Sequence, residues 1–237
     1  MIRWLHPLRV EREVWMSLPP PWFSVKSMSG DYSKPVRMSS SRMEAAITDP
    51  AELVMDPADV SAIAHATATA LLSRGQETDD SRVREALVRF ADEHGLDTLA
   101  DLWSRAHALS LPGALWRLYL VRAVVNHSPH DIATLFQRGV DGLSTIDPVV
   151  AGAPDPLNAE DFSGVLDEIL RGAFEGDLAH ALERAAAVAK AVSAGAVSLA
   201  LSNDRDASLL TSRSLSWSVI AQDLQGCAAK ARKGTLN

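Results

Sequence analysis

A ladder of helix start and stop signals runs from Asp56 almost to the C-terminus and constrains the fold of this chain more than any other feature. Oxygen-bearing side chains or prolines precede stretches with apolar residues at helical spacing: Asp56-Pro57, Thr78-Asp79, Ser110 with Pro112, Ser128-Pro129, Asn158 and Asp177. Glycines stand where such stretches stop, at Gly75, Gly95, Gly139 and Gly176. Residues of these kinds satisfy the backbone groups left unpaired at helix ends. We therefore predict an all-α fold, a compact bundle of about seven to eight helices.

The apolar periodicity predicts where these helices lie. We expect them over about residues 57–74, 80–94, 97–109, 110–125, 128–139, 159–174, 178–194 and 206–230. The fourth is apolar on nearly all sides apart from Arg117 and Arg122, which is typical of a central, buried helix. The last helix places Leu210, Trp217 and Leu224 at sevenfold spacing. Three prolines within residues 139–158 predict a long irregular connection there.

Residues 1–42 differ in kind from the rest of the chain. They hold three of the six tryptophans (Trp4, Trp15, Trp22), three consecutive prolines at 19–21 and a serine-rich stretch. They carry seven basic and three acidic residues, whereas residues 43–237 carry 16 basic and 27 acidic ones. We therefore expect a single helical domain over 43–237, preceded by a disordered extension. Two alternatives stay open: a docking arm with aromatic anchors, or translation that starts at Met38 or Met43.

Charge and composition disfavour several classes of function. The acidic body repels a phosphate backbone, so nucleic-acid binding by its main surface is disfavoured. No apolar run in the sequence approaches the roughly 20 residues that cross a bilayer, and charges at residues 9–13 interrupt any secretory signal. The single cysteine, Cys227, forms no internal disulfide and fits a reducing compartment. We expect a cytoplasmic protein without a membrane association.

A cluster of aromatic and arginine residues is the first candidate binding site. Helices 97–109 and 110–125 are joined by a tight connection, so six side chains could converge: Trp103, Arg105, Trp116, Arg117, Tyr119 and Arg122. They would form an aromatic-walled pocket for a small anionic ligand. The alternative, which we favour, is a structural one, because a buried arginine needs a carboxylate partner. Asp101 or Glu85 would then pair with Arg117 and Arg122, and the tryptophans would belong to the core.

The doublet His130-Asp131 is the sharpest candidate for catalysis. Helical phosphohydrolases of the HD type bind divalent metal through a histidine, a His-Asp pair and a later aspartate, and the metal activates water. The first ligand could come from His65, His94 or His107 and the last from Asp167 or Asp177. However, Asp131 also fits a capping box with Ser128 at the start of a helix. We therefore keep the metal site as the alternative, and otherwise expect no cofactor and no catalytic residues.

Two segments resemble stretches in uncharacterised helical proteins of high-GC actinobacteria. These are residues 110–120 (SLPGALWRLYL) and 172–184 (GAFEGDLAHALER), and arginine outnumbers lysine 13 to three within residues 43–237, as such genomes favour. The resemblance covers about half of the chain and implies neither an activity nor any site residue.

The absence of a complete catalytic motif in the sequence favours a non-enzymatic function. We predict a helical interaction or regulatory module that recognises a protein partner through a surface patch or the N-terminal arm. The metal-dependent phosphohydrolase centred on His130-Asp131 is the alternative. The sequence leaves the partner and the oligomeric state open.

Overall fold

The computed structural model describes residues 57–90, 96–142, 151–152, 159–202 and 205–237. Within these ranges the chain is helical and contains no strand, which confirms the predicted fold class. The chain divides into two units, residues 1–62 and 63–237, and only residues 57–62 of the first are described. The expected N-terminal extension and its boundary at residue 42 lie outside the described residues.

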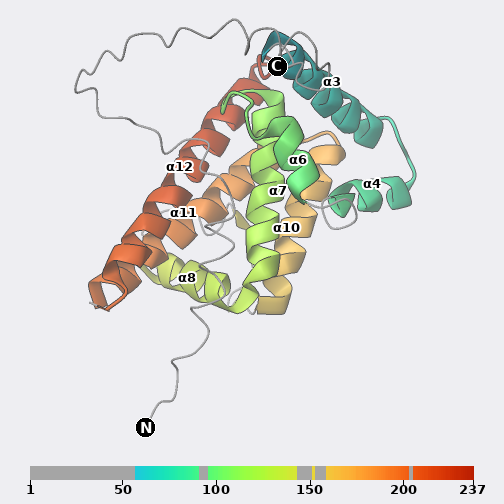
Figure 1. Ribbon diagram of the computed structural model, residues 1–237. Helices are drawn as coiled ribbons and strands as arrows, with labels where there is room; N and C mark the ends of the chain where they lie inside the picture. The colour runs from blue at the N-terminus through green and yellow to red at the C-terminus, as the bar shows by residue number, and fades with distance from the viewer. Residues whose placement is uncertain (1–56, 91–95, 143–150, 153–158, 203–204) are drawn as a thin grey trace, which may run out of the picture. The chain divides into compact units, whose positions relative to one another are not determined.

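The described helices follow the predicted order (Figure 1). Their bounds are α3 Pro57–Gln76, α4 Ser81–Val88, α6 Leu96–Trp103, α7 Leu111–His127, α8 Pro129–Gly142, α10 Ala159–Phe174, α11 Leu178–Ser202 and α12 Ala207–Arg232. Ser110 caps α7 as predicted, whereas the cap of α4 is Asp80, one residue after the predicted pair Thr78-Asp79. The Ser110 side chain accepts a hydrogen bond from the Gly113 N–H before α7, and Asp80 accepts one from the Arg82 N–H before α4.

Helix α7 is buried along most of its length, as its nearly unbroken apolar sequence predicts. Leu115, Tyr119, Val121 and Val125 are each fully buried. The helix packs against α6, α8, α10, α11 and α12. The carbonyl of Asn237, the last residue, accepts a hydrogen bond of 2.8 Å from the Leu111 N–H at the start of α7.

Helix α11 packs against four helices, α12, α8, α10 and α7, and is paired most extensively with α12. Its apolar residues have a mean hydropathy of 1.6 over 18 residues, and by length and composition it is the one described helix that could span a membrane. More than half of that stretch is buried inside the protein. A helix in the core of a bundle has the same composition, since it is covered on several sides.

Two glycines allow α8 and α11 to cross with their backbones in contact. A Cβ atom on Gly139 would lie 1.8 Å from the carbonyl oxygen of Ala191, and one on Gly195 would lie 1.7 Å from that of Leu135. These distances are far inside van der Waals contact, so both positions require a residue without a side chain. The α8–α11 crossing, defined by these four residues, fixes how the C-terminal hairpin of α11 and α12 is held in the bundle.

Several predicted helix ends are wrong, because glycines that were expected to stop a helix lie inside one and admit a neighbouring group. Helix α8 continues past Gly139 to Gly142, so the irregular connection begins later than residue 139, and Ala151 is again helical and buried. Helix α11 runs to Ser202 rather than to about residue 194. Gly75 likewise lies inside α3, against the Phe174 ring. Gly176 follows the end of α10 with φ of +110°, as predicted, and Gly95 lies outside the described residues.

Candidate functional site

The aromatic members of the expected ligand pocket are core residues. Trp103 and Tyr119 are fully buried, and their ring centres lie 6.2 Å apart. The Trp103 indole N–H donates to the Thr67 hydroxyl at 3.0 Å, and the Tyr119 hydroxyl donates to the Leu87 carbonyl at 2.5 Å. Buried polar groups of aromatic residues normally find such partners. These two side chains therefore tie α6 and α7 to α3 and α4.

Arg117 is held by a carboxylate from the far end of the sequence. Its Nε and Nη2 atoms donate to Asp223 Oδ2 at 2.9 and 2.6 Å, and its Nη1 atom donates to the Gly113 carbonyl at 3.0 Å. The side chains of Arg117 and Asp223 are 12% and 21% exposed. This ion pair joins α7 to α12.

Arg122 makes the corresponding contact on another side of α7. Its Nε atom donates to Asp167 Oδ1 of α10 at 2.6 Å, and its side chain is only 5% exposed. Internal pairing is expected for both arginines, and the structure pairs Arg117 with Asp223 and Arg122 with Asp167; Glu85 takes part in neither pair, and Asp101 stays a prediction. The Asp101 side chain lies outside the described residues. Asp167 is thereby engaged in an ion pair, although it was a candidate metal ligand.

The six residues of the expected pocket thus point to different neighbours. At 100° per residue Arg117 lies on the side of α7 away from Tyr119 and Arg122, and the three side chains bond to three different helices, α12, α4 and α10. Trp116 is buried, and Arg105 is exposed on the segment that follows α6. The structure brings Trp103 and Tyr119 together and separates the cationic groups of Arg117 and Arg122. The observed contacts do not bring all six residues around one cavity. An anion-binding pocket formed by all six therefore stays a prediction.

His130 and Asp131 lie in the first turn of α8. His130 is exposed, and its carbonyl accepts a hydrogen bond from the Thr134 hydroxyl. Within the described part of the chain, no three His, Cys, Asp or Glu side chains gather closely enough to hold a metal ion. Asp177 accepts a hydrogen bond from the His180 N–H at the start of α11, and His94 lies outside the described residues. The metal site stays a prediction for which the described residues supply no further ligand.

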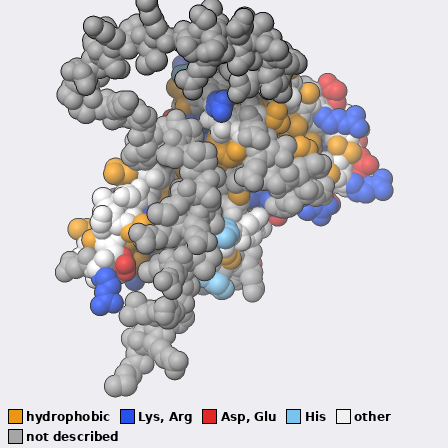
Figure 2. Space-filling model, in the orientation of Figure 1, with side chains coloured by type: hydrophobic (Ala, Val, Ile, Leu, Met, Phe, Trp, Pro, Cys, Tyr) orange, Lys and Arg blue, Asp and Glu red, His pale blue; other side chains and the backbone are white. Residues whose placement is uncertain are grey.

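An exposed aliphatic surface that the sequence does not predict lies where α11 ends and α12 begins. We call it the distal surface, and it comprises five side chains that are 37–83% exposed: Val197, Leu201, Leu209, Leu215 and Val219. Figure 2 shows separate apolar groups among uncharged ones at this end of the molecule, with a basic and an acidic side chain at its tip. Leu201 alone is 83% exposed. Isolated exposed aliphatic residues are ordinary, whereas several of them on two helices that pack together are a candidate binding surface.

Charge near this surface is confined to the turn between the two helices, where Arg205 is exposed and Asp206 half-buried. The sequence has no charged residue between Lys190 and Asp204, and the stretch 207–222 of α12 contains only Arg213, which is buried. Exposed hydroxyls nearby bond to their own helices: Thr211 donates to the Ala207 carbonyl, and Ser202 donates to those of Ser198 and Leu199. The uncharged run in the sequence is the signal that could have identified this surface.

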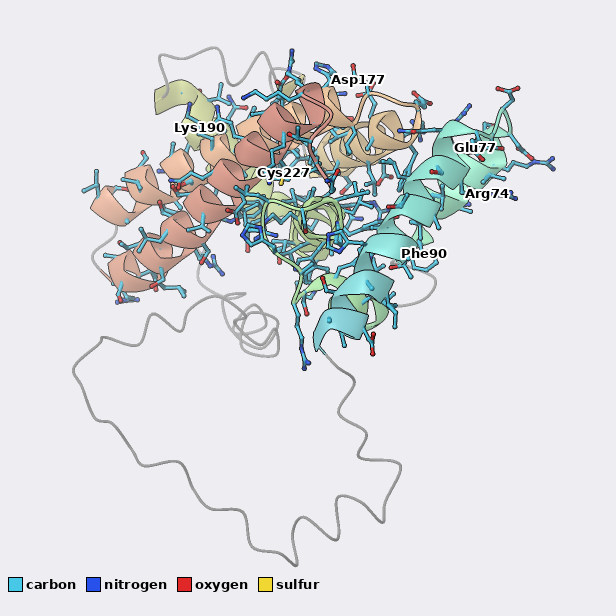
Figure 3. The ribbon with its side chains drawn as sticks, turned by 90° about the horizontal axis from the view of Figure 1, so that it is seen from above. Arg74, Glu77, Phe90, Asp177, Lys190 and Cys227 are labelled. Atoms are coloured by element: carbon cyan, nitrogen blue, oxygen red, sulfur yellow. The ribbon has the colours of Figure 1, made fainter. Side chains whose placement is uncertain are left out.

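The single thiol lies apart from the distal surface. Cys227 is fully buried among packed side chains, as Figure 3 shows, and its Sγ atom contacts the Ala108 carbonyl at 3.2 Å. Burial raises the pKa of this thiol from 9.0 to about 11. A thiol with a raised pKa carries little thiolate at neutral pH, so Cys227 has the character of a core residue rather than that of a nucleophile.

Comparison of the chain with models of protein families, with curated proteins and with solved structures finds no match. The resemblance to helical actinobacterial proteins therefore stays a prediction.

Proposed function

We propose that this protein is a non-enzymatic interaction module of the cytoplasm whose helical bundle presents the distal surface to a protein partner. The observation that carries the proposal is the exposure of five aliphatic side chains on an uncharged part of α11 and α12. Exposed aliphatic groups that lie together are costly in water, and binding a partner removes that cost.

The contacts of the other candidate residues agree with a scaffold. Arg117 and Arg122 are paired with carboxylates, and Trp103 and Tyr119 use their polar atoms to join helices. These side chains stabilise the bundle and need no ligand to do so. Leu201 and Leu215 of the distal surface, by contrast, are each more than half exposed. Their side chains therefore contribute little to the packing of the described bundle.

Site-specific photo-crosslinking in cells tests the proposal. A photoreactive amino acid replaces Leu201 or Leu215 in the full chain, and the control position is Ile63, an aliphatic residue of α3 that is 42% exposed. We expect crosslinked products of defined mass at the two distal positions and none at Ile63. Mass spectrometry then identifies the partner, and Leu201→Glu should abolish its binding to the purified protein.

The absence of any specific product at both distal positions would refute the proposed function. Equal crosslinking at Ile63 would also contradict it, because the contact would then be unspecific.

A further inference from the structure

Helix α12 carries two seams with the spacing of a coiled coil, on opposite sides. The inner seam consists of residues at alternating intervals of four and three, all buried: Leu210, Ser214, Trp217, Ala221, Leu224 and Ala228. The outer seam has the same intervals and is exposed: Ser208, Ser212, Leu215, Val219 and Gln222. This spacing keeps a row of side chains on one line along a helix, where a second helix packs against it.

The outer seam has the chemistry of a helix–helix contact rather than that of a solvated face. Leu215 and Val219, at its centre, are 56% and 37% exposed. The Ser216 hydroxyl, next to the seam, donates to the Ser212 carbonyl at 3.1 Å, and the Gln222 amide contacts the Ser218 hydroxyl at 3.4 Å. Because these polar groups have partners within their own helix, covering them with another helix leaves few unsatisfied groups.

The order of residues along the outer seam makes it complementary to itself. If two α12 helices pack antiparallel about a two-fold axis at position 217, Leu215 of one copy faces Val219 of the other. Ser212 then faces Gln222, so apolar residues meet apolar ones and polar residues meet polar ones. A two-fold axis brings the same surface patch of two subunits together, so self-complementarity is what such a contact requires.

The distribution of charge also favours a contact between two copies of this chain along the outer seam. The full chain has a net charge of −7, so two copies repel each other at long range. The outer seam avoids this repulsion because the one charged residue of α12 between positions 207 and 222, Arg213, is buried. A coiled-coil partner of another kind would normally be selected by charged residues beside the seam.

We propose that a second copy of this chain covers the α12 part of the distal surface, Leu215 and Val219, by packing antiparallel along the outer seam. This inference rests on the proposed interaction function and names its partner.

Sedimentation velocity over a concentration series tests the proposal with two charge variants of the full chain. The first is Leu215→Glu with Val219→Glu, and the second is Leu215→Lys with Val219→Lys. We expect a reversible dimer for the parent protein and monomers for each variant alone, because like charges meet across the axis. A mixture of the two variants should dimerise again, since opposite charges then face each other. Ile63→Glu is the matched control and should stay dimeric.

Circular dichroism and the melting temperature show whether each variant is folded, and recovery in the mixture requires that both are. A parent protein that is monomeric at every concentration would overturn the second copy as partner. So would a dimer that survives both charge variants, or variants that fail to associate when mixed. Sedimentation of a monomeric parent with phosphatidylcholine–phosphatidylglycerol vesicles, lost in the glutamate variant, would replace the second copy by a lipid surface.

The photo-crosslinking experiment separates this inference from the proposed function. A product at Leu215 that contains two copies of this chain supports both. A product with a different protein retains the interaction module and overturns the second copy.

Discussion

The two parts of helix α11 have nearly the same composition and opposite environments. From Ala181 to Ala196 most residues are buried against α8, α10, α7 and α12, whereas Val197 and Leu201 are 45% and 83% exposed. The buried part is held by the glycine contacts of the α8–α11 crossing. Apolar composition therefore does not by itself determine which residues of α11 are buried. The buried part is the part that a neighbouring backbone, that of α8, approaches closely.

A similar contrast separates the ends of α12. Near its C-terminal end Cys227 is buried, and the Lys230 ammonium group donates to the Leu109 carbonyl at 2.9 Å. Near its N-terminal end the outer seam is exposed and uncharged. The exposed end of the hairpin is thus available for binding, while the other end ties α12 to the start of α7.

The largest expected loss of stability concerns the α8–α11 crossing, which holds the buried part of α11. Gly139→Ala and Gly195→Ala should each destabilise the protein by about 3 kcal/mol or more, because the added methyl group would overlap a backbone carbonyl and force the helices apart. Denaturant unfolding measures the change. Gly164→Ala in α10 is the matched control: nothing lies within 4 Å of its added carbon, so it should stabilise by about 0.5–1 kcal/mol. Tolerance of both crossing variants would show that the two backbones are not in contact.

The next effect concerns charge inside the bundle. Asp167→Ala leaves the Arg122 guanidinium, which is 5% exposed, without its carboxylate partner. We expect a loss of about 2–3 kcal/mol, below the value for a fully buried pair because water reaches Asp167. The matched control is Arg232→Ala, which removes a pair with Glu183 whose arginine is 60% exposed; it should cost clearly less than Asp167→Ala does. Equal losses in urea unfolding would contradict the assignment of Arg122 to the core.

Sequence reasoning recovered the helices and the capping residues but not these contacts. Start signals such as Ser110 act locally and can be recognised from a few residues. Gly139, by contrast, was interpreted as a helix stop because a glycine that ends a helix and one that admits a neighbouring backbone look alike in a sequence. Arg117 and Asp223 are 106 positions apart, so nothing local indicates that they pair. The distal surface was missed because its apolar residues fit the helical pattern equally well as core.

One substitution made at two positions of α11 sharpens the comparison within a single helix. Val192 is fully buried and Val197 is 45% exposed. Val192→Ala should cost about 2 kcal/mol through lost burial and the cavity that remains. Val197→Ala should change the free energy of unfolding by less than about 0.5 kcal/mol, since alanine also favours the helix slightly. Equal effects in denaturant unfolding would mean that the two parts of α11 share one environment.

The smallest effect concerns the thiol in the buried end of α12. The pKa of Cys227 in the folded protein is about 11, above its ordinary value of 9.0. The unfolded chain therefore loses this proton first, so stability falls as the pH rises from about 9 toward 11. Between pH 8 and pH 10, the parent should lose about 1 kcal/mol more of its unfolding free energy than Cys227→Ala does.

A cysteine at the exposed end completes the comparison. In a Cys227→Ala background, Ser212→Cys places a thiol on the outer seam, where Ser212 is exposed. Under native conditions at pH 8 this thiol should react with an aromatic disulfide reagent far faster than Cys227 does in the parent, because thiolate content and access both favour it. The reaction is followed by absorbance at protein concentrations low enough to keep the chain monomeric. Equal rates in the native state, with Cys227 as reactive as in denaturant, would show that the two ends of α12 are equally open to solvent.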